Sequence, residues 1–247
     1  MNMNQIRKNF LKVISISITI LLLIIGCNNN KSKNFEVKKS KNGIVNGIYS
    51  AYILNGDTIA EGQSRFYYPN GQLKEVSNWK DGKLNGQYKK FHNNGMLYYS
   101  LNYINGVVKD GPYISFDRYG KISQKANFIG GAREGEVISY FNNGKISEIL
   151  FVKNDKIDHI VKELDINENE MPLGTLKNGI GSRITYHPNG KINTISIYQD
   201  GDLKWRSISI DDKGNIRNSG TFANGIGDLY IYDEFGYRET ITYDKLK

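Results

Sequence analysis

The sequence is short of several residue types, and each shortage excludes a class of chemistry. It has one cysteine in 247 residues, so no disulfide can form within the chain. It has three histidines, with no zinc-ligand spacing and no serine–histidine–carboxylate motif. Glycines are frequent but recur at a fixed period, whereas a phosphate-binding loop would occur once. We therefore expect no enzyme, no metal site and no cofactor.

The chain also lacks an excess of charge in its folded part. Its net charge is +8, of which the first twelve residues carry three. Five further lysines stand against one acidic residue just beyond the leader: Lys31, Lys33, Lys38, Lys39 and Lys41. From residue 42 onward, 25 Lys and Arg balance 24 Asp and Glu. Since a nucleic-acid-binding domain carries its positive charge as a surface patch, we expect no nucleic-acid partner.

Residues 1–26 have the layout of a secretory signal peptide. A positive start precedes the uncharged apolar stretch 13–25, which is too short for a membrane-spanning helix. The tetrapeptide Ile24-Ile-Gly-Cys27 ends this stretch and resembles the lipobox of bacterial lipoproteins. The resemblance implies cleavage before Cys27, diacylglycerol on its sulfur, and a further acyl chain such as palmitate on its amino group. The alternative is an ordinary signal peptide with a chance cysteine.

Residues 27–46 are polar and lysine-rich, which favours a flexible tether beside anionic lipid. In lipoproteins of double-membrane bacteria, aspartate after the lipidated cysteine commonly marks retention in the inner membrane. Here Asn28 follows Cys27. The resemblance therefore implies a membrane lipoprotein of the outer membrane, facing the periplasm.

The rest of the chain is built on a repeat. Glycines recur nine residues apart, with an apolar residue, usually aromatic, five after the first, and most units begin about 24 residues apart. The pairs are Gly47/Gly56, Gly62/Gly71, Gly86/Gly95, Gly111/Gly120, Gly135/Gly144, Gly181/Gly190 and Gly227/Gly236. Such a period indicates an array of identical supersecondary units, here placed in 47–247.

Each unit reads as strand, turn, strand, turn, because Asn-Gly and Asp-Gly between strand-like segments favour tight hairpins. The expected turn glycines are Gly71, Gly95, Gly120, Gly144, Gly190 and Gly236. The aromatics expected to stack as a ladder are Tyr67, Phe91, Phe116, Tyr140, Tyr186 and Tyr232. Two histidines next to turns, His92 and His187, are expected to point outward.

These features predict an all-β fold, an elongated single-layer antiparallel meander of about eight to nine β-hairpin repeats. Two units are degenerate. The unit 205–214 replaces the first glycine with Trp205, and the unit 158–167 has lost both glycines, which makes about 155–180 the interruption of the array.

The repeated phrases resemble MORN-repeat proteins of the bacterial variant type. They include Phe66-Tyr-Tyr-Pro-Asn-Gly-Gln-Leu73, Tyr140-Phe-Asn-Asn-Gly-Lys-Ile146 and Tyr186-His-Pro-Asn-Gly-Lys-Ile192. Proteins of this type often bear the label of YwqK-family antitoxins. The resemblance implies the fold, but repeat folds host many roles.

Three functions therefore stay open. The first is a lipid-anchored scaffold that binds an envelope protein, the second a module for carbohydrate, peptidoglycan or lipid head groups, and the third an immunity or antitoxin protein. The acidic interruption is the most distinctive stretch, and its candidate binding residues are Asp158, Glu163, Asp165, Glu168 and Glu170. Calcium is a weak alternative there, because the glycine and final glutamate of a calcium loop are missing.

Overall fold

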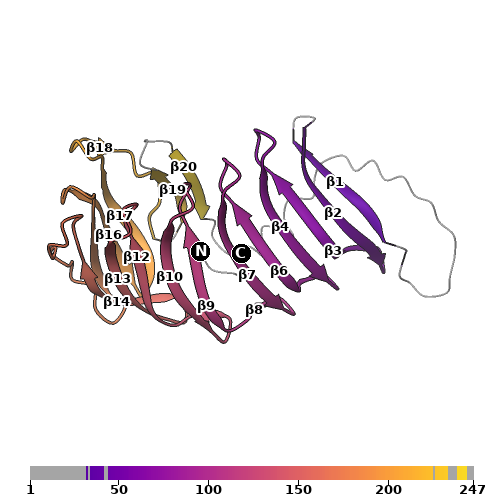
Figure 1. Cartoon of the computed structure of the whole chain (residues 1–247), viewed down its shortest axis with the longest axis horizontal. Helices are drawn as coiled ribbons and strands as arrows, with labels where there is room; N and C mark the ends of the chain where they lie inside the picture. The colour runs from indigo at the N-terminus through magenta and orange to yellow at the C-terminus, as the bar shows by residue number, and fades with distance from the viewer. Residues whose placement is uncertain (1–31, 33, 42–43, 225, 233–237, 244–247) are drawn as a thin grey trace.

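In the computed structural model, the strands of residues 35–163 follow one another along the long axis of the molecule (Figure 1). The structure describes residues 32, 34–41, 44–224, 226–232 and 238–243. All regular elements within these ranges are strands. Among the residues searched there, no helix has the length and apolar character needed to cross a membrane.

The strands fall into three sheets. The first holds β1 (Phe35–Lys41), β2 (Ile44–Leu54), β3 (Asp57–Tyr67), β4 (Leu73–Lys80), β5 (Lys83–Leu84), β6 (Gly86–Phe91), β7 (Leu97–Ile104), β8 (Val107–Val108), β9 (Gly111–Phe116), β10 (Ile122–Ile129), β11 (Ala132–Arg133), β12 (Gly135–Tyr140), β13 (Ile146–Lys153) and β14 (Lys156–Glu163). The second holds β15 (Gly181–Tyr186), β16 (Ile192–Gln199), β17 (Asp202–Ile210) and β18 (Ile216–Arg217). The third pairs β19 (Gly227–Tyr232) with β20 (Arg238–Tyr243).

In the first sheet, spatial order follows chain order and every pairing is antiparallel. The two-residue strands β5, β8 and β11 pair only with the ends of β4, β7 and β10. The predicted meander of hairpins is therefore confirmed, with one difference. The array is divided into sheets of fourteen, four and two strands instead of running through as a single sheet.

One repeat unit shows why the sequence folds this way. Strands β6 and β7 pair over six positions, from Gly86↔Tyr103 to Phe91↔Leu97. Gly95 closes the hairpin at a φ of 85°, which is open to glycine at little cost. Asn105 and Gly106 then turn the chain at φ of 50° and 85°, the left-handed geometry that tight hairpins require.

Neighbouring units are joined less completely than the two strands within a unit. Strands β4 and β6 pair at only two positions, Glu75↔Lys90 and Val76↔Lys89, because β5 takes up the end of β4. Side chains bridge the units instead. Tyr68 donates to the carbonyl of Phe91 at 2.7 Å, and Asn94 Nδ2 donates to the carbonyl of Arg118 at 2.8 Å.

Two clusters of buried side chains mark one face of the first sheet, which we call the inner face. Tyr103, Val108 and Phe128 form one cluster on it, with Tyr88, Tyr113 and two leucines packed alongside. A second cluster of buried residues joins the last strands of the first sheet to the four-stranded sheet. Its members are Val137, Leu150, Val152, Ile160, Leu176 and Tyr198.

The array begins earlier than the sequence indicated. Residues 35–41, expected within the flexible tether 27–46, form β1 and pair with β2, with Phe35 opposite Ala51 and Val37 opposite Tyr49. The pair Gly47/Gly56 is also out of phase with the other units. Gly56 lies in the turn that joins β2 to β3, whereas Gly47 lies inside β2, where an added Cβ would be 2.5 Å from the Phe66 ring.

The array is interrupted where an eight-residue motif replaces the second strand of a unit. Gly174-Thr-Leu-Lys-Asn-Gly-Ile-Gly181 precedes β15, and Gly220-Thr-Phe-Ala-Asn-Gly-Ile-Gly227 leads into β19. Each motif buries one apolar side chain, Leu176 or Phe222. Because the described residues that precede the last glycine of each motif pair only through isolated bridges, the sheet breaks at both places.

Candidate functional site

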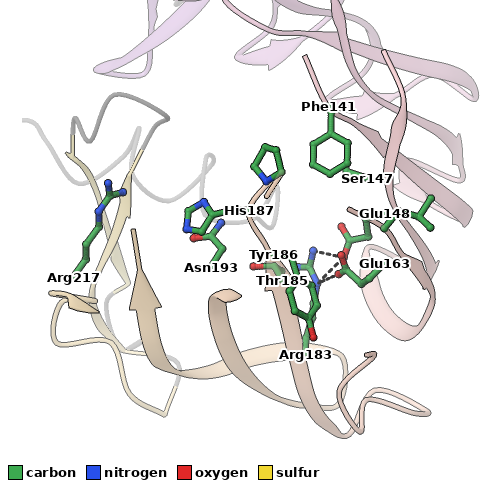
Figure 2. A pocket seen from close by; sticks show the side chains of 12 residues that line it. Phe141, Ser147, Glu148, Glu163, Arg183, Thr185, Tyr186, His187, Asn193 and Arg217 are labelled. Carbon is green, nitrogen blue, oxygen red and sulfur yellow. Dashed lines mark hydrogen bonds and ion pairs between the residues drawn. The ribbon is translucent and has the colours of Figure 1, made fainter. Parts of the chain in front are cut away.

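A cavity of ≈ 290 Å³ lies where the fourteen-stranded sheet ends and the four-stranded sheet begins (Figure 2). Residues from β13, β14, β15, β16 and β18 and from turns beside these strands line it. They are Phe141, Ser147, Glu148, Glu163, Leu164, Arg183, Thr185, Tyr186, His187, Pro188, Asn193 and Arg217. The site therefore exists because the degenerate unit opens the array at this point.

The strand register brings two carboxylates to the wall of this cavity. A row of directly opposed residues crosses the sheet from β7 to β14, namely Tyr99, Ser115, Gln124, Ser139, Glu148 and Glu163. The members before Glu148 are neutral. Glu148 and Glu163 are like charges opposite each other, an arrangement that destabilises a sheet unless something compensates it.

Arg183 on β15 supplies part of that compensation. Its Nε donates to Glu148 Oε1 at 2.8 Å, and its Nη2 contacts the same oxygen. The distance from Arg183 Nε to Glu163 Oε1 is 3.9 Å, too long for a hydrogen bond. Glu163 is 4% exposed, and within the described part of the chain its Oε1 is a buried side-chain oxygen without a hydrogen-bond partner.

The pKa of Glu163 depends on its burial and on its two charged neighbours, Glu148 and Arg183. Burial raises the pKa of Glu163 well above its ordinary value, and the hydrogen bond and charge of Glu148 raise it further, while Arg183 opposes the shift. At neutral pH the two carboxyl groups therefore hold one proton between them. Burial and the nearby Glu163 also raise the pKa of Tyr186.

The opposite wall is aromatic and polar. Figure 2 shows Phe141 above the carboxylates and His187, Asn193 and Arg217 across the cavity from them. The Tyr186 hydroxyl donates to the carbonyl of Pro172 at 2.8 Å, which fixes the ring against the degenerate unit. The cavity thus presents an end with two carboxyl groups and an opposite wall that holds rings, an amide and the Arg217 guanidinium.

Of the five predicted binding residues, the structure places only Glu163 in the cavity. Asp158 lies on β14 with its carboxylate bonded to Lys153 and His159, which lowers its pKa. The other three lie in or after the turn that follows β14. Asp165 caps that turn, while Glu168 pairs with Lys145 and Glu170 pairs with Lys162.

The turn at Asp165 uses its carboxylate internally. Oδ1 accepts from the backbone N–H groups of Asn167 and Asn169, both at 2.9 Å, and Oδ2 accepts from Asn169 Nδ2. Asp211 makes the same bonds in the other degenerate unit. This is turn capping, and the described residues hold no group of three or more potential metal ligands.

The degenerate unit is also one residue out of register with its expected bounds. Glu168, at a φ of 69°, occupies the place of the turn glycine, so the unit matches 159–168 and not 158–167. Its backbone N–H donates to the carbonyl of Asp165, as the N–H of Gly120 donates to that of Asp117.

Sequence reasoning missed Glu148 and Arg183 because each lies in a unit with normal glycines. A signal was nevertheless available. Glu148 is the fourth residue after the turn glycine Gly144, and the neighbouring units carry the uncharged Gln124 and Thr194 at that place. The unit at 62–71 also has a carboxylate at that place, Glu75, but it lies opposite Lys90, whereas Glu148 lies opposite Ser139 and Glu163.

Two expectations about the repeat residues are wrong. His92 and His187 do not point outward: both are half-buried, and Nε2 of each bonds to a carbonyl of the next unit, Phe116 O at 2.9 Å and Ile210 O at 2.7 Å. The ring–ring contacts also run elsewhere than through the expected ladder. They join Tyr88, Tyr99, Tyr103, Tyr113 and Phe128 on the inner face.

The expected ladder positions Tyr67, Phe91, Phe116, Tyr140 and Tyr186 are half-buried strand ends. In some units the backbone carbonyl at this position accepts a hydrogen bond from a side chain of the preceding unit. Tyr68 bonds in this way to Phe91 O, and His92 to Phe116 O. The side chain that connects consecutive units is therefore the residue directly after the expected ladder position. The turn glycines Gly71, Gly95, Gly120, Gly144 and Gly190 all have positive φ. Cys27, Gly236 and the Tyr232 side chain lie outside the described residues.

Comparison with known families agrees with this geometry. Residues 60–81, 84–105, 133–154 and 180–200 match the MORN repeat variant. These four segments are MORN repeats. Each matched segment covers one hairpin and the turn that follows it, and together the matches cover less than half of the chain. The two degenerate units and the unit at 111–120 fall outside the matched MORN segments.

A search of curated protein sequences gives no match. Among solved structures, a chain in the crystal structure of TcdB2-TccC3-Cdc42 is similar at 12% sequence identity and a TM-score of 0.19. The match covers 84% of the present chain and 11% of that chain. At this TM-score the likeness adds nothing to the description of the fold.

Proposed function

We propose that this chain is a non-enzymatic protein-interaction scaffold, anchored to the membrane through an acylated Cys27. The MORN repeats support an interaction module, because each unit packs mainly on its neighbours and leaves an extended surface. The carrying observation is an apolar patch at the edge formed by the turns between units. It consists of Ile104, Val107 and Ile129, which are 55%, 49% and 54% exposed.

These three side chains belong to two consecutive turns and lie together. A Cβ added at Gly131 would be 2.5 Å from Val107, so Val107 packs directly on the turn that follows Ile129. The units on either side carry lysines at the corresponding turn positions. The four lysines are Lys80, Lys83, Lys153 and Lys156, all exposed.

An exposed apolar centre with a charged rim is the anatomy of a protein interface. The partner that fits it is a protein with an apolar patch bordered by acidic side chains. On this proposal, the acylated Cys27 and the lysine-rich segment after it hold that partner near the membrane surface, with the outer membrane facing the periplasm as the proposed location.

The test is crosslinking with mass spectrometry on cells that produce the full chain. The Ile104→Asp/Ile129→Asp double variant should lose a reproducible crosslinked partner, while Ile216→Asp, at a more exposed site away from this edge, should keep it. Recovery of the same partner by the double variant contradicts the proposed surface. Loss of membrane association in Cys27→Ser tests the anchor separately.

A second candidate, a carbohydrate or peptidoglycan-binding module, is favoured by the aromatic contacts on the inner face. Tyr88 and Tyr99 stack with ring centroids 5.9 Å apart, and Tyr113 lies 5.7 Å from Tyr99. All three rings are half-buried and share one face, as a sugar platform requires. Sedimentation of the unlipidated chain with peptidoglycan tests this candidate, and a pellet no larger than that of a Tyr99→Ala variant contradicts it.

A further inference from the structure

The cavity between the two sheets has a feature that the proposed scaffold does not use. Two carboxylates, Glu148 and Glu163, face one guanidinium, that of Arg183. With both carboxylates ionised, the group lacks one positive charge, which a proton supplies at neutral pH. The proton sits at the wall of a cavity of ≈ 290 Å³, large enough for a small organic molecule.

Geometry shows where a ligand would bond. Arg183 directs Nε and Nη2 to a single oxygen, Oε1 of Glu148, and Glu163 Oε1 is left without a hydrogen-bond partner. Glu163 is 4% exposed, so this oxygen has lost its water without gaining a hydrogen bond. A donor that also carries positive charge meets both requirements, the missing bond and the missing charge.

We propose that this cavity binds a small organic cation, such as a primary ammonium group, between Glu148 and Glu163 in place of the shared proton. The ammonium donates to Glu163 Oε1, and the apolar part of the ligand packs against Phe141 and Tyr186. One proton leaves to solvent for each cation bound, so the charge of the site is unchanged. This inference does not depend on the scaffold proposal.

The charged and titratable groups around the site are few. Glu148, Glu163 and Arg183 come from β13, β14 and β15, and Tyr186 closes the end of β15. His187 and Arg217 lie on the opposite wall. Burial lowers the pKa of Arg183, whereas Glu148 and Tyr198 on β16 raise it. The Arg217 guanidinium across the cavity favours a ligand whose far end is a hydroxyl or another acceptor.

The experiment is calorimetric titration of the full chain with n-butylammonium, with n-butanol and butyrate as probes of the same size. We expect butylammonium to bind and the other two not to bind. Because one proton is released per ligand, the affinity should rise by about tenfold per pH unit between pH 6 and pH 8. Buffers of different ionisation enthalpy should show that proton directly in the measured heat.

Variants separate the site from the fold. Glu163→Gln should abolish both binding and proton release, whereas Glu136→Gln, exposed on the adjacent β12, should change neither. Ser147→Phe keeps both carboxylates but fills the cavity, and should also abolish binding. Circular dichroism and thermal melting confirm that each variant is folded. Equal binding of butanol, pH-independent binding, or no binding of butylammonium overturns the proposal.

Discussion

The regular stretch of the array, residues 57–163, and the interrupted stretch, residues 164–227, use the same residue types for different purposes. In the regular stretch, turn glycines such as Gly144 have positive φ and open space around them. In the interrupted stretch, a Cβ added at Gly174 would be 2.1 Å from the carbonyl oxygen of Ser182. Glycine serves backbone conformation at Gly144 and the close approach of two backbones at Gly174.

The two regions also treat charge differently. The polar row of the regular stretch is neutral from Ser115 to Ser139 and needs no counter-ion. At the end of the regular stretch the row holds the charged Glu148 and Glu163, and Arg183 of the interrupted stretch bonds to Glu148 from the next sheet. The site thus arises where the repeat fails, because an interrupted array leaves both a cavity and unmatched side chains.

The largest expected effect separates the two glycine roles. Gly174→Ala should lower the free energy of unfolding by roughly 3 kcal/mol, because a backbone oxygen must move and the bond from Leu176 N to Ser182 O is lost. Gly144→Ala should cost about 1–2 kcal/mol through its φ alone. Urea unfolding measures both, and equal costs would contradict the distinction.

The next effect concerns charge. The folded-state pKa of Glu163 is raised above its ordinary value of 4.5, so its stabilising contribution is complete below that pH and is lost as the pH rises toward the folded-state value. Stability should fall with a slope of up to about 1.4 kcal/mol per pH unit. Glu163→Gln should flatten the profile between pH 5 and pH 8, as measured by chemical denaturation, whereas the exposed Glu136→Gln should leave it unchanged.

A third comparison concerns glycine substitutions at two turn residues with positive φ, Glu168 in the interrupted stretch and Asp155 in the regular stretch. Glu168 holds a φ of 69° where regular units have glycine, so Glu168→Gly should stabilise the chain by about 1 kcal/mol. Asp155 also holds a positive φ, 66°, but its carboxylate accepts from Arg133 Nε at 2.8 Å. Asp155→Gly should therefore gain less in the same thermal melts, and a larger gain than that of Glu168→Gly would refute this account.

The smallest effect tests the bonds between regular units. Asn94→Ala removes the bond to the carbonyl of Arg118 and the cap on Met96 N, and should cost about 0.5 kcal/mol because both are exposed. The adjacent, exposed Asn93→Ala serves as the matched variant, since only its backbone carbonyl takes part, accepting from Asn70. Amide hydrogen exchange should show faster opening of the Arg118 turn in Asn94→Ala alone.

Much of the fold was predictable because turn chemistry is local. Asn105-Gly106 and Asp81-Gly82 require positive φ whatever surrounds them, and such turns at a fixed period leave antiparallel hairpins as the consistent arrangement. The error at Gly47 has the opposite cause. Glycine is needed there because the ring of Phe66, nineteen positions away in the chain, leaves no room for a Cβ. The histidine bonds were missed for the same reason, since their acceptors belong to the next unit.

The amino-acid order alone determined the period, the turns and the all-β meander, because these depend on backbone conformations set within a few residues. Only the tertiary structure decided that Glu148, Glu163 and Arg183 meet at one cavity. They come from three strands, and their meeting depends on strand register and on the lost strand of the degenerate unit. Register and the break between sheets arise from packing across the array, which no local pattern encodes.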